Sequence, residues 1–157
     1  VMNVMPPRSC YSLLQEDLWP DEYAILVSCI LLNCTSRRQV EDVLPEFLDR
    51  WPDAKSLSLA DVSELECVIM PLGLHKRRSR VLKKFAHAYG SVKNVLDLPG
   101  IGKYASDAYK LFIDVDDDVD PKDHALNAYN SWLKVKGIDQ IEENHTDDNY
   151  FNDQKNS

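Results

Sequence analysis

The sequence predicts an all-helical fold, and three observations support this prediction. Successive segments space their apolar residues at helical intervals of three and four. No segment shows the sustained apolar–polar alternation of strands. A glycine-containing turn, Leu98-Pro99-Gly100-Ile101-Gly102, lies between two short helical stretches. With 157 residues, 44% of them hydrophobic, the chain is long enough for one core, so we expect one domain over residues 1–141.

The first long helices are expected to form the centre of this core. Residues 21–33 are apolar on every side, as in a helix surrounded by other helices. Pro45 predicts a kink or an adjusted first turn in the next helix, which Trp51-Pro52 ends. The apolar residues of that next helix repeat at helical spacing: Val40, Val43, Leu44, Phe47 and Leu48.

Two further helices are expected between residues 61 and 90. Asp61, with Glu64 three residues later, gives a capping-box pattern, and Pro71-Leu72-Gly73 ends that helix. A basic helix follows and closes at Tyr89-Gly90. Its inward residues are expected to be Val81, Leu82, Phe85 and Tyr89.

The basic side chains of that helix form either a solvated face or a phosphate-binding surface. Helical spacing puts four of them on one face. These four are Lys76, Arg80, Lys83 and Lys84.

The last helices flank the glycine turn and an acidic loop. Residues 92–97 and 103–113 are expected to be helical, followed by the loop 114–120 and a helix over 124–136 with Gly137 as its C-cap. Beyond Ile141 the sequence is polar and almost free of aliphatic residues, so we expect an acidic, disordered tail over 142–157.

The net charge of −8 is unevenly distributed along the chain. Residues 1–112 hold 14 Lys and Arg against 14 Asp and Glu, whereas residues 113–157 hold 4 against 12. Residues 1–112 are therefore neutral overall, and the negative charge lies in residues 113–157. The net charge thus does not exclude a nucleic-acid partner.

The cysteines and the hydropathy exclude other classes of protein. The longest apolar run, residues 23–32, is too short to cross a membrane, and the first residues lack the order of a signal peptide. The cysteines show no metal-binding spacing, which predicts reduced thiols in an intracellular protein. These cysteines are Cys10, Cys29, Cys34 and Cys67.

The glycine turn is the motif that points to a function. Two glycines around Ile101 give a tight hairpin that opens onto a helix N-terminus, where backbone N–H groups can bind a DNA phosphate. The alternative is a plain turn between two helices.

With its flanks, this hairpin resembles that of the helix-hairpin-helix DNA glycosylases, which commonly reads Leu-Pro-Gly-aliphatic-Gly and precedes an essential aspartate. Within that superfamily the chain is most similar to the catalytic domain of methyl-CpG-binding-domain thymine/uracil mismatch DNA glycosylases, over residues 14–133. The matching stretches, in order, are Leu14-Gln15-Glu16, Leu31-Leu32-Asn33-Cys34-Thr35-Ser36, Pro71-Leu72-Gly73-Leu74, Gly100-Ile101-Gly102-Lys103-Tyr104 and Pro121-Lys122-Asp123-His124.

The resemblance implies that Asp123, 19 positions after Tyr104, is the catalytic carboxylate. An ionised carboxylate suits this role, because breaking an N-glycosidic bond develops positive charge on the sugar. The alternatives are an ordinary N-cap aspartate before His124 and Asp120 as the catalytic residue. Alignment through Leu126 and Tyr129 favours Asp123.

Tyr104 stands where bifunctional members carry the lysine that forms a Schiff base with the sugar. A phenol cannot form one, and Lys103 projects about 100° away on a helix, so the resemblance implies base removal without lyase activity. No cysteine follows Cys67, so the superfamily's iron–sulfur cluster is not expected. We expect no metal cofactor, with a monovalent cation at the hairpin as the one ion that the resemblance allows.

Three more positions are expected to contact the flipped nucleotide and the gap it leaves. Gln15 matches the base-recognising glutamine of the family, whose amide offers a donor and an acceptor; the alternative is a surface glutamine. Leu74 matches the apolar residue that enters the duplex; the alternative is a C-cap contact with the preceding helix. Cys34 replaces the arginine that fills the space of the flipped nucleotide.

DNA binding is expected to be weaker than in the family. Ala125 and Ala128 replace lysines that would contact phosphates, and the acidic loop precedes Asp123 directly. The residues expected to contact DNA are Leu98, Gly100, Gly102, Lys103, Arg37 and Arg80.

The sequence therefore predicts a monomeric, nuclear, monofunctional DNA glycosylase that excises thymine or uracil mispaired with guanine in double-stranded DNA. One alternative is a glycosylase with another preference, such as adenine opposite an oxidised guanine. The other is a helix-hairpin-helix DNA-binding domain with weak or lost catalysis.

Overall fold

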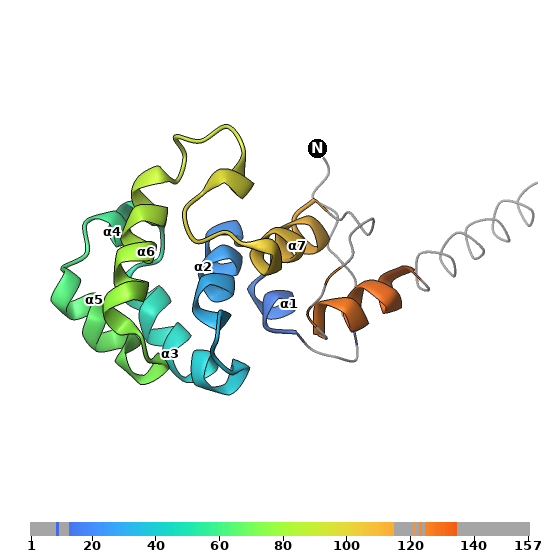
Figure 1. The fold of residues 1–157 in the computed structure, drawn as a ribbon, viewed down its shortest axis with the longest axis horizontal. Coiled ribbons are helices and arrows are strands. Elements are labelled where there is room, and N and C mark those ends of the chain that lie inside the picture. Colours follow the sequence, from blue (N-terminus) through green and yellow to red (C-terminus); the bar gives the residue numbers. More distant parts are fainter. Residues whose placement is uncertain (1–8, 10–12, 115–120, 122, 124, 135–157) are drawn as a thin grey trace, which may run out of the picture.

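The computed structural model describes residues 9, 13–114, 121, 123 and 125–134. All regular elements within these residues are helices, which confirms the all-helical prediction (Figure 1). The elements are α1 Leu14–Leu18, α2 Glu22–Leu32, α3 Arg37–Arg50, α4 Ala54–Ser58, α5 Val62–Ile69, η1 Met70–Leu72, α6 His75–Ala88, η2 Val95–Asp97 and α7 Lys103–Phe112. Residues 125–134 form a further helix.

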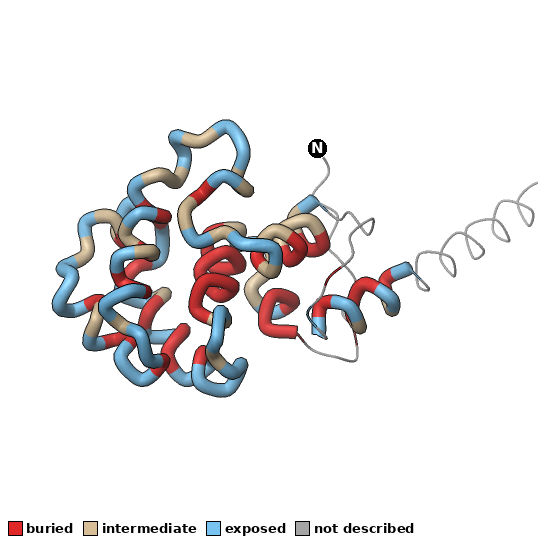
Figure 2. Tube along the Cα trace, viewed as in Figure 1, coloured by how far each residue is buried: buried red, intermediate tan, exposed pale blue. Residues whose placement is uncertain are grey.

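Helix α2 is the central helix, as its uniformly apolar sequence predicted. Its side chains are buried all round, and Figure 2 shows it in red between the two halves of the molecule. On one side it packs in a cluster with residues of α3 to α6, and on the other with residues of α1, α7 and 125–133. Helix α2 therefore contributes side chains to both clusters.

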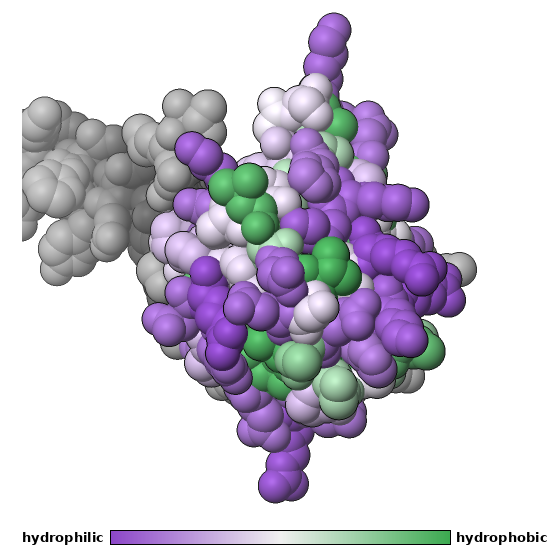
Figure 3. Space-filling model, turned by 90° about the vertical axis from the view of Figure 1, so that its left-hand side faces the viewer, coloured by the Kyte–Doolittle hydropathy of each residue, from purple (hydrophilic) through white to green (hydrophobic). Residues whose placement is uncertain are grey.

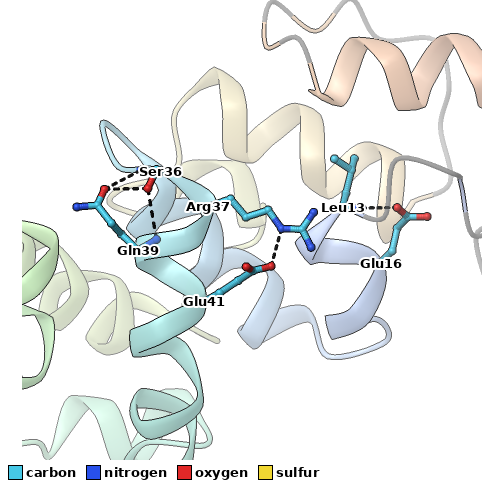
Figure 4. Close-up of polar contacts among 6 residues, drawn as sticks. All are labelled: Leu13, Glu16, Ser36, Arg37, Gln39 and Glu41. Carbon is cyan, nitrogen blue, oxygen red and sulfur yellow. Dashed lines mark hydrogen bonds and ion pairs between the residues drawn. The ribbon is translucent and has the colours of Figure 1, made fainter.

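Helix α3 ends at Arg50, before Trp51-Pro52, as the sequence predicted. It begins at Arg37, because Ser36 and Gln39 form a capping box (Figure 4), and it continues through Pro45 to Arg50. Pro45 is exposed, so water can bind the carbonyl that lacks a proline N–H partner.

The short elements were poorly predicted. Helix α4 was missed, because its five residues are too few to show a period; Asp53 caps it through the Ser56 N–H at 2.7 Å. Of residues 92–97, only Val95–Asp97 is helical. Helix α5 starts after its predicted N-cap Asp61, and α6 ends before Tyr89 as expected.

The prediction that Lys83 lies on the basic face of α6 is wrong. Its ammonium donates to the carbonyls of Ser58 at 2.5 Å, Ala60 at 2.8 Å and Leu57 at 3.4 Å. These are carbonyls at and just after the C-terminal end of α4, where a cation is stabilising. Lys83 thus holds α4 against α6, and Lys84 is the exposed neighbour.

We expect Lys83→Met to lower the free energy of unfolding by about 2 kcal/mol, because three partly buried carbonyls lose a charged donor. Lys84→Met, which removes the same charge from an exposed position, should change it by less than about 0.5 kcal/mol. Urea unfolding of both variants measures the difference. Equal losses would show that the carbonyl contacts of Lys83 do not stabilise the fold.

The surface of the α4, α5 and α6 side is mostly hydrophilic, with separate small hydrophobic patches (Figure 3). No helix in the described part of the chain is long and apolar enough to cross a membrane. Several predictions fall outside the described residues: the end of the domain at 141, the tail 142–157, the loop from 115 to 120 with Asp120, and the C-cap Gly137.

Candidate active site

A cavity of about 590 Å³ opens where the two core clusters meet. It is lined by α1, the C-terminal end of α2 with the turn after it, the glycine hairpin, the start of α7, and residues 123 and 125. Segments far apart in the sequence therefore converge on one pocket. The predicted site residues on its wall are Gln15, Cys34, Arg37, Gly100, Gly102, Lys103, Tyr104 and Asp123.

Gln15 and Tyr104 form the polar part of the pocket wall. Gln15 is 1% exposed, so the alternative of a surface glutamine is wrong. Its Nε2 donates to the Tyr104 hydroxyl at 2.8 Å and to Cys29 Sγ at 3.6 Å. This pairing joins α1 to α7 across 89 positions of sequence.

The two side chains that accept from Gln15 remain neutral at physiological pH. Burial raises the pKa of the Tyr104 phenol well above its ordinary value, the nearby Asp123 carboxylate adds to the effect, and the hydrogen bond from Gln15 opposes it. Burial likewise raises the pKa of the Cys29 thiol to about 12. The pocket wall around Gln15 therefore consists of neutral hydrogen-bonding groups.

Asp123 is both the N-cap of a helix and part of the cavity wall. Its Oδ1 accepts from the backbone N–H groups of Ala125 at 3.0 Å and Leu126 at 3.1 Å, so it caps the helix of residues 125–134. The same side chain is exposed and lines the cavity. A carboxylate held from behind by two amides is fixed in place and still has lone pairs for a ligand.

The hairpin packs closely against the core through Gly100. Its φ is +85°, and a Cβ there would lie 2.7 Å from Val81 Cγ1 and 3.3 Å from Ile30 Cδ1, so only glycine fits. The Leu98 side chain is 3% exposed, so a contact of this residue with DNA would have to be made by its backbone, and that contact stays a prediction. Its backbone N–H donates to the carbonyl of Val95, and its carbonyl accepts from the N–H of Ile101. Leu98 supports the hairpin from inside.

The start of α7 presents donors to solvent. Gly102 is the N-cap of α7 and brings no capping side chain to the first-turn amides. Lys103, in that first turn, has a side chain 53% exposed and is paired with buried Asp107 at 2.8 Å. In the sequence, only the spacing of four residues on a helix indicates this ion pair.

Arg37 lies at the edge of the cavity. Figure 4 shows its side chain extending from α3 toward α1, and its Nε is 2.6 Å from Glu41 Oε1.

Glu16, which the sequence did not single out, is buried and accepts from the Leu13 N–H at 2.5 Å. It holds the start of α1 beside the pocket. Arg80 is exposed on α6.

A second cavity, of about 320 Å³, adjoins the first. Asn33, Cys34 and Gly100 line both. Leu74 lines only the second and is 61% exposed, and its role in entering the duplex or in a C-cap contact with the preceding helix stays a prediction. An exposed leucine and an exposed cysteine thus stand at the edge of this hollow.

Within the described residues, no three His, Cys, Asp or Glu side chains gather closely enough to hold a metal ion. Cys29, Cys34 and Cys67 are free thiols. The expectations about an iron–sulfur cluster and a monovalent cation stay predictions.

Comparison with known sequences gives two kinds of match. Residues 27–148 match the family model of the HhH-GPD superfamily base excision DNA repair proteins. The chain is 41% identical over 135 residues to the methyl-CpG-binding domain protein 4-like protein of Arabidopsis thaliana, covering 84% of this chain and 30% of that protein. It is 37% identical over 95 residues to the thymine/uracil-DNA glycosylase of Pyrobaculum aerophilum, covering 55% and 41%. The chain thus spans less than half the length of these curated relatives.

Solved structures have the same fold. A thermostable thymine-DNA glycosylase superposes with a TM-score of 0.57 at 28% identity, covering 62% of this chain and 49% of that chain. Endonuclease III in a trapped covalent intermediate with DNA gives a TM-score of 0.54 at 18% identity, covering 64% and 56%; this likeness concerns the fold alone.

Proposed function

The chain belongs to the HhH-GPD superfamily of base excision DNA repair proteins, and from this premise we propose that it is a DNA glycosylase that excises thymine or uracil mispaired with guanine. The observation that carries the proposal is the convergence of Gln15, Tyr104 and Asp123 on one cavity. Relatives named thymine/uracil-DNA glycosylase support the choice of base.

In this proposal a flipped pyrimidine occupies the larger cavity with its polar edge against Gln15. The two N–H bonds of the buried Gln15 amide are donated to Tyr104 and Cys29, which holds the amide in place and leaves its carbonyl oxygen to accept a hydrogen bond from a base. A site of this kind discriminates strongly, because a base with the wrong edge leaves buried polar groups unpaired.

Asp123 is proposed to stabilise the positive charge that develops on the sugar as the glycosidic bond breaks. The two amide contacts on Oδ1 fix the carboxylate, so little reorganisation is needed during the reaction. Its exposed position at the pocket wall also allows it to orient the attacking water.

Double-stranded DNA is the proposed partner. The uncapped amides at the start of α7, together with Lys103, Arg37 and Arg80, suit contacts to phosphates on either side of the flipped nucleotide. Action as a monomer in the nucleus stays a prediction.

The competing proposal is a DNA-binding domain that has lost catalysis. Three residues favour it, because each lowers the expected affinity for DNA. Cys34 is exposed at the position of the family's arginine, and Ala125 and Ala128 carry no charge near Asp123.

We expect strand cleavage of a G·U duplex to require alkaline treatment after incubation with the protein. Tyr104, at the position of the lyase lysine, is a neutral phenol, and the ammonium of Lys103 is held by Asp107. Gel analysis with and without alkali tests this. Borohydride trapping of a covalent protein–DNA adduct would contradict it and point to Lys103 as an amine nucleophile.

A further inference from the structure

Two turns beside the pocket contain a non-glycine residue with left-handed backbone geometry. Cys34 has a φ of 62° in the turn between α2 and α3, and Leu74 has a φ of 49° in the turn between η1 and α6. Such residues cost about 1 to 3 kcal/mol each and persist only where their surroundings fix them. Both residues line the second cavity, so something must hold the two turns around it.

Arg78 connects these turns. It is 7% exposed, and its Nη2 donates to the carbonyl of Asn33, the residue before Cys34, at 2.5 Å. Its Nη1 donates to the carbonyl of Leu72, two residues before Leu74, at 3.3 Å. One planar guanidinium therefore joins two turns that are far apart in the sequence. Because its N–H donors are rigidly arranged, it also fixes the distance between the two carbonyls that it binds.

The two turns carry the side chains that face the proposed DNA. Leu74 is 61% exposed, and Cys34 lines both the base pocket and the adjoining hollow. A shift of one turn relative to the other would change the gap into which the DNA must fit. A displacement of about 1 Å in a group that positions the substrate is enough to lower the rate of an enzymatic reaction substantially.

We propose that Arg78 is a positioning residue that sets the spacing between the Cys34 turn and the Leu74 turn and so determines how well the protein opens the duplex. This role rests on the proposed glycosylase function. Arg78 acts through the two carbonyls, because its own charge is buried beneath the turns.

The first test needs no DNA and stays informative if the proposed function fails. The amides of Thr35 and Gly73 are hydrogen-bonded within the two turns, to Leu32 O at 3.2 Å and Met70 O at 3.0 Å. In Arg78→Met we expect hydrogen exchange at both amides to be about tenfold faster, while α2 amides keep their rates. Arg50→Met, which removes an arginine paired with Glu46 on α3, should leave both amides unchanged.

The second test measures single-turnover excision from a G·U duplex at saturating protein. Arg78→Met should lower the excision rate at least about tenfold, with less than about a threefold change in DNA affinity. Arg78→Lys keeps the charge but lacks the planar guanidinium, so it should restore only part of the lost rate. In the Arg78→Met background, Leu74→Ala should lower the excision rate by a much smaller factor than it does in the wild type. The two effects are not additive if Arg78 acts by positioning Leu74.

The outcomes separate the proposals. Unchanged exchange at Thr35 and Gly73, or equally faster exchange throughout the protein, would overturn the positioning role. Additive effects of Arg78→Met and Leu74→Ala would overturn it as well. Faster exchange at both turns in a protein that excises nothing would leave the link between the turns in place and reject the glycosylase function.

Discussion

Asp123→Asn is expected to reduce base excision by about 1000-fold, which corresponds to about 4 kcal/mol of lost transition-state stabilisation. The amide cannot stabilise a cationic sugar. It can still cap the helix of residues 125–134, because an asparagine oxygen accepts from Ala125 and Leu126 as the carboxylate does. Folding and DNA affinity should therefore be retained, and single-turnover kinetics with a binding titration measure both.

Two matched variants control for this substitution. Asp61→Asn makes the same change at the N-cap of α5, away from the pocket, and should keep the wild-type rate. Asp120→Asn tests the rival carboxylate and should have little effect. A large loss in Asp120→Asn with activity retained in Asp123→Asn would mean that the catalytic assignment is wrong by three residues.

Gln15→Met should lower excision by about 100-fold, the second largest effect. Methionine has similar length and fills the buried position, but it offers no hydrogen bond to a base, and removing one such group from a closed site typically has this cost. It also leaves the Tyr104 hydroxyl without its donor. The discrimination between uracil and cytosine should fall together with the rate.

Tyr104→Phe is the matched control for that loss. It keeps the ring and removes only the hydroxyl that accepts from Gln15 Nε2, so we expect a loss of about tenfold, smaller than for Gln15→Met. A Gln15→Met protein that excises uracil at the wild-type rate would show that the base does not bind against this amide.

The features of the fold that could be predicted from the sequence are those set by local patterns. A run of residues apolar on every side predicted α2, and two glycines around Ile101 predicted the hairpin. Asp61 marked the start of α5 because an N-cap acts on amides within the same turn. Each of these depends on residues close together in the chain.

The features that were missed depend on residues brought together by folding. Lys83 was grouped with the basic surface, since nothing in its own helix reveals the carbonyls of Leu57, Ser58 and Ala60. The burial of the Leu98 side chain was not predicted, because it depends on how the hairpin packs against the core. The role of Arg78 could not be predicted either, because its two hydrogen bonds reach turns that are distant in the sequence.

The candidate site shows both sides of this limit. The resemblance identified Gln15, Tyr104 and Asp123 as expected site residues, and they do lie on one cavity. The hydrogen bonds from Gln15 to Tyr104 and Cys29 could not be predicted from the sequence, because they join segments that are far apart in the chain. The capping by Asp123 is local and was one of the two interpretations that the sequence allowed.

The most direct test of the proposed function is to measure the free base released from a panel of duplexes that differ in a single pair. The panel contains uracil opposite guanine, thymine opposite guanine, adenine opposite an oxidised guanine, and a fully matched control. We predict release of uracil and thymine from the two guanine mispairs, with both strands otherwise intact and no release by Asp123→Asn. Release of adenine alone would contradict the base assignment, and binding of every duplex without release of any base would show that the chain is a DNA-binding domain and not a glycosylase.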